Sequence, residues 1–357
     1  MKYFLFLLLS IPTFANDGAF FAKGNQLIPM LETDISVKKE ILTLKKVNNK
    51  YIEVTVYYEF FNPKNDKNLI VGFEAFSPSG DVDGTPLNGK HPYMSDFTVE
   101  LNGQSLKYDI AYVDSETYVS NGFVKSKNLK DILKSIDNVN EVDFYYVYHF
   151  NTKFTKGLNK IKHTYRYDLS GSIDFNYDFE YVLTAANRWG NKQIDDFTLI
   201  VEMGEFESFN INKSFFNDKS EWQIEGIAKT ENIKGTKNTL IEKDALRFHL
   251  QKGKIIFKKL NFKPKGELFV YSQNHIGIEN YSYLPYSYYQ QEFIENPKTE
   301  FHKKILKNLA FARRGYIFKN PELKKYFENL DWYIADQNYV PDVEKLHEKE
   351  KEFISKW

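Results

Sequence analysis

Three carboxylates on one predicted strand are the first candidates for chemistry. In residues 172–183, Asp174, Asp178 and Glu180 share one face of the strand, and aromatic residues share the other. Alternate residues of a strand lie roughly 7 Å apart, and a carboxylate pair at such a spacing can act as acid and base on a glycosidic bond. Strand alternation alone also produces a solvated polar face above an aromatic core face. We favour this simpler interpretation and keep glycan hydrolysis as the alternative.

Two arginines, Arg313 and Arg314, end an apolar stretch with helical spacing. Cations suit the negative end of a helix dipole, and Gly315 can adopt the left-handed conformation that follows a helix end. Arg313 is in line with the inward-facing residues, so it needs a carboxylate or carbonyl partner, which Glu328 or Asp331 could provide. Alternatively, its guanidinium binds an anionic ligand such as a peptide carboxylate or a wall phosphate. The pattern favours the structural role.

Aromatic side chains follow these arginines and complete a candidate binding surface. Tyrosine and tryptophan combine a large apolar ring with one polar group, which suits them to binding surfaces. The candidate ligand-binding residues are Arg313, Arg314, Tyr316, Trp332 and Tyr333. We expect no catalytic residue among them.

The familiar catalytic and metal-binding motifs are missing from the sequence. The seven histidines show no metal-ligand spacing, and the HEKEK stretch at 347–351 has Lys351 where a zinc protease needs its second histidine. There is no nucleophile elbow and no phosphate loop. GDVDG at 80–84 lacks the remaining ligands of a calcium loop and is interpreted as a turn. We therefore expect no metal, no cofactor and no enzymatic activity.

Composition and the N-terminal residues indicate an exported protein. Residues 1–15 combine Lys2, a short apolar stretch and small residues, which is typical of a secretory signal peptide. The 357 residues include no cysteine, so neither disulfides nor a thioether-linked lipid anchor are available. Lysine plus arginine equals aspartate plus glutamate, 48 each, which argues against a nucleic-acid partner. We expect a soluble periplasmic or extracellular protein without a membrane span.

A basic ribbon of six lysines runs through residues 252–266. It could face an anionic envelope polymer. A solvated edge strand, protected from aggregation by its charges, explains the lysines equally well.

The elements that must position these residues are mainly strands. Alternating stretches at 51–63, 141–150, 161–169 and 195–204, with an Asn102-Gly103 hairpin turn at 96–106, predict antiparallel β-sandwich architecture. The exception is 127–136, which has helical spacing. We expect six segments: a signal peptide (1–15), a first β-sandwich unit (16–125), a connecting helix (126–140), a second β-rich unit (141–273), a Tyr-rich linker or strap (274–298) and a small all-α module (299–357).

The β-rich region resembles a family of exported bacterial proteins that is known as a domain of unknown function. The resemblance rests on a start with Asn16, Asp17 and Ala19 and on a W-x-x-x-x-I-x-x-F-x-L-x-V strand pair that begins at Trp189. It implies export and a β fold, and it implies no reaction.

The C-terminal stretch FARRGYIFKNPELKKYFENLDWY resembles the YARHG domain, a small module of secreted bacterial proteins. The similarity covers about residues 299–357, and two signature positions depart from it: Phe311 stands for the tyrosine and Arg314 for the histidine. If that histidine carries proton chemistry in relatives, this chain has lost it. The companions of the domain include peptidoglycan-binding modules, which implies work at the cell wall by association.

These observations favour an exported cell-envelope protein that binds or assembles at the wall without catalysis. Its expected partner is a cell-wall polymer or an envelope protein. The alternative is a peptidoglycan or glycan hydrolase that uses the carboxylates of 172–183.

Overall fold

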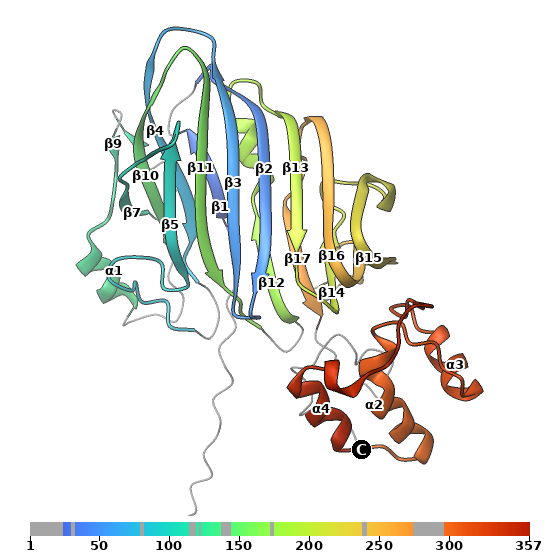
Figure 1. Cartoon of the computed structure of the whole chain (residues 1–357). Coiled ribbons are helices and arrows are strands. Elements are labelled where there is room, and N and C mark those ends of the chain that lie inside the picture. Colours follow the sequence, from blue (N-terminus) through green and yellow to red (C-terminus); the bar gives the residue numbers. More distant parts are fainter. Residues whose placement is uncertain are drawn as a thin grey trace, which may run out of the picture.

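The computed structural model describes residues 24–29, 33–78, 82–113, 119–120, 123–136, 144–171, 175–237, 241–273 and 296–357. The expected signal peptide lies outside these residues, as does the Tyr-rich stretch up to residue 295. The described residues of 24–273 are called the β body below, and residues 296–357 the helical module (Figure 1).

Two main sheets build the β body. The large mixed sheet contains, in spatial order, β12 (Phe175–Tyr181), β17 (Leu268–Gln273), β14 (Glu207–Asn212), β16 (Ala245–Phe262), β13 (Ile194–Glu202), β2 (Ser36–Val47), β3 (Tyr51–Asn62), β11 (Gly157–Asp168), β5 (Met94–Leu101) and β6 (Gln104–Ser105), with β15 (Trp222–Ile233) on β16. The smaller antiparallel sheet contains β1 (Gly24–Pro29), β4 (Lys67–Phe76), β10 (Tyr145–Phe154) and β7 (Asp109–Val113). β8 (Val119–Ser120) and β9 (Phe123–Val124) form a separate pair.

Several predicted strands are confirmed with their local causes. The alternating stretch 51–63 forms β3, whose inward side chains are buried at every second position. The predicted hairpin joins β5 to β6 through Asn102 and Gly103, both with positive φ, as a two-residue turn requires. One pair departs from the antiparallel expectation, because β2 and β13 run parallel.

Strand pairing joins the two expected sandwich units. β10 pairs with β4, and β11 pairs with β3 and β5, so strands from both sides of residues 126–140 share each sheet. The predicted helix is present as α1 (Leu129–Ile136), and its Ile132 is buried in the core. The helix therefore covers the common core and does not divide two units.

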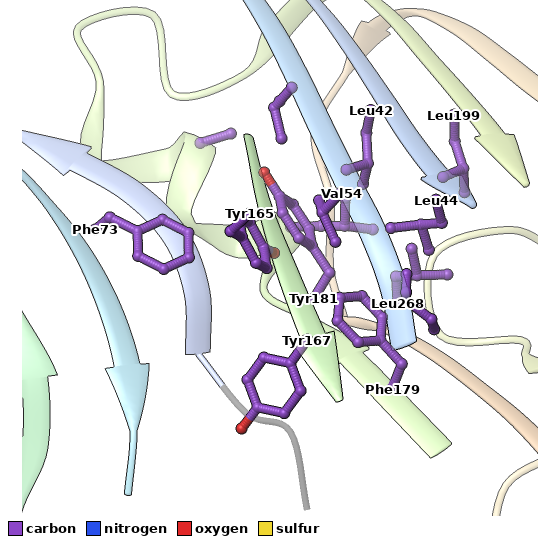
Figure 2. Packing of buried hydrophobic residues seen from close by; sticks show 14 of the residues in the cluster. Leu42, Leu44, Val54, Phe73, Tyr165, Tyr167, Phe179, Tyr181, Leu199 and Leu268 are labelled. Carbon is purple, nitrogen blue, oxygen red and sulfur yellow. The ribbon is translucent and has the colours of Figure 1, made fainter. Parts of the chain in front are cut away.

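The large sheet curls, so that β12 and β17 face β2 and β3. Figure 2 shows Tyr181 and Phe179 of β12 packing toward Leu42, Leu44 and Val54. These buried rings and aliphatic side chains form one contiguous cluster with the strands of the smaller sheet. Without cysteine, such apolar burial stabilises the fold.

The long strand β16 pairs with two different strands along one of its sides. β14 pairs with residues 245–250 of β16, and β13 pairs with residues 255–262 on the same side. The basic ribbon starts on this strand. The edge-strand interpretation is wrong for Lys252 and Lys254, because β15 pairs with residues 245–257 of β16 and covers its other side there. Lys258 and Lys259 lie beyond this pairing, so the interpretation stays open for them. Two lysines of the ribbon pair with carboxylates of 221–225: Lys254 with Glu225 at 3.1 Å and Lys259 with Glu221 at 2.7 Å.

The helical module contains α2 (Glu300–Ala312), α3 (Pro321–Glu328), α4 (Glu348–Ser355) and the single turn Val343–Lys345. Gly315 follows α2 with φ of +87°, and a Cβ there would lie 2.5 Å from the carbonyl oxygen of Ile334. Asn320 caps α3 through bonds from the backbone N–H groups of Glu322 and Leu323. The predicted helix end and helix start are therefore confirmed. None of the described helices has the length and apolar character needed to cross a membrane.

Candidate functional site

A cavity of about 690 Å³ lies where the helical module meets the β body. Three segments supply its lining: the turn from β2 to β3, the connection from β13 to β14, and the helical module. The lining residues are Lys46, Asn48, Asn49, Met203, Gly204, Glu205, Phe206, Glu207, Arg313, His347, Glu348, Lys349 and Glu350. Volumes of this order are typical of small-molecule sites.

The helical wall of the cavity is a buried cluster of two arginines and one glutamate. Arg313 Nη2 lies 2.6 Å from Glu350 Oε1, and Arg314 bonds both oxygens of the same carboxylate at 2.6 and 2.8 Å. The side chains of Arg313 and Glu350 are 4% and 1% exposed. Glu350 also accepts the backbone N–H of His347 at 2.8 Å, as a capping box for α4. The carboxylate thus ties the end of α2 to the start of α4.

Phe206 connects this cluster to the β body. Its ring lies beneath both guanidiniums, 4.2 Å from Arg313 and 4.6 Å from Arg314, which is cation–π geometry. The connection from β13 to β14 holds the ring there: Phe206 has φ of +54° and donates its N–H to the carbonyl of Gln251. The Gln251 side chain donates in turn to the carbonyl of Arg313 at 2.7 Å.

The β wall of the cavity carries a second ion pair. Lys46 Nζ lies 2.5 Å from Glu207 Oε2, and the Tyr177 hydroxyl donates to Glu207 Oε1 at 3.0 Å. Lys46 also lies over the Tyr177 ring, at 5.0 Å. Burial raises the pKa of Glu207, while the neighbouring charges of Lys46 and Arg313 oppose that shift. Arg313 and Glu207 line the same cavity.

The buried part of the site has one cation more than it has carboxylates. Lys46, Arg313 and Arg314 face Glu207 and Glu350, which gives three positive charges against two negative ones. An anionic group suits such a site, because guanidinium and ammonium donors form strong charge-assisted bonds with carboxylates. Within the described residues there is no group of metal-ligating side chains.

The structure gives Arg313 a partner that the sequence did not suggest. Arg313 is buried, as predicted, but it pairs with Glu350 and not with Glu328 or Asp331. Glu328 lies near Lys324 instead, at 3.9 Å. Proximity along the chain was misleading here, because α4 folds back on α2.

The other predicted ligand-binding residues lie in different surroundings. Arg314 bonds the cavity-lining Glu350. Trp332 and Tyr333 are buried in the core of the helical module, where the Tyr333 hydroxyl donates to the carbonyl of Tyr316. Of the five candidates, only Arg313 contributes to the cavity lining. Ligand binding by the other four stays a prediction.

The carboxylates of the predicted strand 172–183 are separate from this cavity. Asp178 is buried on β12, Glu180 is half-buried, and Asp174 lies outside the described residues. Neither Asp178 nor Glu180 lines the cavity. The face of β12 that carries them is therefore less solvated than the alternation predicts.

Sequence reasoning missed the β wall and the connection that holds Phe206. Lys46 and Glu207 are 161 residues apart, and each sits in an ordinary strand pattern. The one local signal is the sequence MGEFES at 203–208, where a phenylalanine follows a glycine between two strands. An apolar ring in a turn indicates a contact with another part of the chain.

Comparison with known proteins supports the C-terminal resemblance and the fold. Residues 281–357 match the YARHG domain, which extends the similarity 18 residues beyond the expected start at 299. A solved structure from Legionella pneumophila, described as a "putative nutrient binding protein", is similar over 95% of this chain and 98% of its own, with 17% identity and a TM-score of 0.51.

Other solved structures align with smaller parts of the chain. An M1 zinc metallopeptidase from Deinococcus radiodurans aligns with 66% of this chain and 42% of its own length, at 10% identity and a TM-score of 0.23. No curated protein matches the sequence.

Proposed function

We propose that this protein is a non-enzymatic binding protein of the cell envelope and that its ligand occupies the junction cavity. The observation that carries the proposal is the cavity itself: about 690 Å³, walled by both parts of the chain, with buried ion pairs on each wall. Buried charges are costly unless they are paired, so a site that keeps five of them beside a cavity suggests a binding role.

Two comparisons support a binding role. The Legionella protein of similar fold is described as nutrient binding, and the similarity spans nearly the whole of both chains. The YARHG domain at the C-terminus is associated with secreted proteins and wall-binding companions, and residues 281–357 match it. A soluble fragment of the cell wall would fit both comparisons, since it is a small molecule and is found in the envelope.

The hydrolase alternative finds no support at the cavity. Its proposed carboxylates, Asp178 and Glu180, belong to β12 and do not line the cavity. Release of soluble muropeptides would nevertheless favour it, so the binding experiment should score that release as well.

The test uses the purified full chain with isolated peptidoglycan sacculi and with soluble muropeptides. Lys349 is an exposed lining residue on α4, so Lys349→Trp should narrow the cavity without disturbing the core. Lys325→Trp makes the same change at an exposed position of α3 outside the lining. We expect the parent chain and Lys325→Trp to bind, and Lys349→Trp to bind at least about tenfold more weakly.

Two outcomes would overturn the proposal. If the parent chain captures neither sacculi nor muropeptides, the wall assignment falls. If Lys349→Trp binds as well as Lys325→Trp, the ligand binds elsewhere on the chain.

A further inference from the structure

The charges around the junction cavity are arranged in two levels. The floor is lined by the buried side chains Lys46, Glu207, Arg313 and Glu350. Arg314 lies outside the lining and bonds Glu350, and with it the five groups carry a net charge of +1 when all are ionised. The rim consists of the exposed residues Asn48, Asn49, Glu205, His347, Glu348 and Lys349. Two glutamates face one lysine there, so the rim carries −1 with His347 neutral. The cavity is therefore positive inside and negative at its mouth.

We propose that the cavity binds a free amino acid or a short peptide, with its terminal carboxylate on the floor and its ammonium group at the rim. The inference rests on the proposed function, because it names the ligand class of the same site. A zwitterion of this length matches both charge levels at once, and the cavity volume accommodates a few residues.

The floor supplies the stronger half of the recognition. Arg313 lines the cavity from the helical module and Lys46 lines it from the β body. Both side chains are at least nine-tenths buried, at 4% and 5% exposure, so water screens them weakly. A carboxylate between them would add the one negative charge that balances the floor. It would also contact both parts of the chain, so binding should hold the helical module against the β body.

The rim supplies the weaker half, because its charges are exposed. Glu348 is 85% exposed, and surface pairs of this kind contribute little. An ammonium group at the rim should therefore improve affinity only a few-fold. The rim glutamates Glu205 and Glu348 also select between ligands, because they repel a ligand that carries negative charge along its whole length.

Inorganic phosphate and anionic polymers fit the site less well. Glu207 and Glu350 hold two carboxylates beside the cations, so a second negative charge on the ligand would meet repulsion. The hydroxyl of Tyr177 already donates to Glu207, so it is not available as a donor to phosphate. One carboxylate is the charge that the floor accommodates.

Isothermal titration of the full chain tests this assignment with four probes: alanyl-alanine, alanyl-alanine amide, N-acetyl-alanyl-alanine and inorganic phosphate. We expect the dipeptide to bind, and its amide to bind at least about tenfold more weakly, because the charge-assisted bonds on the floor are lost. The N-acetyl form should lose about threefold, since only the rim contact is lost. Phosphate should not compete with the dipeptide.

Matched variants locate the rim contact. In the double variant Glu205→Gln with Glu348→Gln, the dipeptide and its N-acetyl form should bind equally, whereas Glu242→Gln, an exposed change outside the lining, should keep the difference. Equal binding of the dipeptide and its amide, or competition by phosphate, would overturn the inference. If Lys349→Trp abolishes capture of muropeptides while no dipeptide binds, the ligand class is wrong and the proposed function stands.

Discussion

The helical module and the β body each bury a glutamate, and they stabilise it in opposite ways. Glu350 of the helical module lies against two guanidiniums, with its side chain 1% exposed. Glu40 of the β body, 4% exposed, has no cation beside it among the described residues: it accepts a hydrogen bond from the Tyr181 hydroxyl at 3.3 Å and also interacts with Tyr58, which is bonded to Tyr181. Burial raises the pKa of Glu40 to about 8. The helical module thus buries a paired charge, and the β body buries a group that is largely neutral at pH 7.

The difference indicates that a buried carboxylate is kept ionised beside the cavity, at Glu350, and is largely neutral away from it, at Glu40. Arg313 and Glu350 border the cavity, Arg314 bonds Glu350, and their ion pairs keep charge available at the junction. Glu40 lines only a space of about 10 Å³, the size of one water molecule, with Trp189 and other apolar residues nearby. A neutral carboxyl suffices there because no ligand can enter.

Glu350→Gln should have the largest effect, because it leaves two buried guanidiniums without a carboxylate. We expect the free energy of unfolding to fall by about 3–5 kcal/mol, the usual cost of removing one partner of a buried pair. Urea unfolding that is followed by tryptophan fluorescence, with Trp332 buried in the helical module, measures the loss. Glu348→Gln on the same helix is the control, since its side chain is 85% exposed. Equal effects of the two changes would contradict the role of the buried cluster.

Glu40→Gln should remove the pH dependence that Glu40 gives to the stability of the β body. A carboxyl whose pKa rises from 4.5 to about 8 on folding stabilises the fold fully below pH 4.5, and this stability is lost as pH rises toward 8. The difference is on the order of 3 kcal/mol between about pH 5 and pH 8. Glutamine cannot ionise, so the variant should gain stability over the parent chain as pH rises.

The measurement is the urea midpoint of both chains at four pH values between about 5 and 8. The groups that face Glu40 are Tyr58 and Tyr181, whose own pKa values are raised well above 10, so they do not titrate in this range. Parallel curves for the two chains would show that Glu40 is ionised in the folded state.

Phe206→Leu should weaken the contact between the helical module and the β body. The leucine keeps an apolar contact but loses the cation–π interaction with Arg313 and Arg314, so we expect a loss of about 1 kcal/mol. Phe76→Leu, at a phenylalanine that is 40% exposed, is the control and should change stability by less than about 0.5 kcal/mol. If both changes lower the free energy of unfolding equally, the Phe206 ring contributes only buried apolar area and no cation–π interaction.

Local elements of both regions were predictable from the sequence, and their mutual contacts were not. The Asn102-Gly103 hairpin, the Gly315 helix end and the Asn320-Pro321 helix start each follow from residues a few positions apart. The parallel pairing of β2 with β13 joins segments about 150 residues apart and has no local signal.

The candidate site shows the same division. Arg313 was predicted to face inward with a carboxylate, and this is confirmed, but the partner came from α4 and not from the neighbouring α3. Lys46 and Glu207 meet only because the end of β2 and the start of β14 lie side by side at the cavity. A site that is assembled from three distant segments leaves no spacing to recognise.

His163→Phe should have a small effect at pH 7 and sharpens the comparison from within the β body. His163 is fully buried, and its ring stacks between those of Tyr58 and Tyr165. Neither ring nitrogen has a hydrogen-bond partner among the described residues. Replacing a buried polar group by an apolar one of similar shape should raise the free energy of unfolding by about 1 kcal/mol at pH 7.

The pH dependence of His163 has the opposite sign to that of Glu40. Burial lowers the pKa of His163 from 6.5 to about 3, so its neutral form is compatible with the fold above pH 6.5, and stability is lost as pH falls from 6.5 toward 3. Phenylalanine should remove that loss, so the gain over the parent chain should grow as the solution is acidified. Tyr165→Phe is the control, because it deletes a buried hydroxyl from the same cluster without changing a group that titrates in this range. Its effect should be independent of pH, and a constant effect of His163→Phe would mean that folding leaves the pKa of the imidazole unchanged.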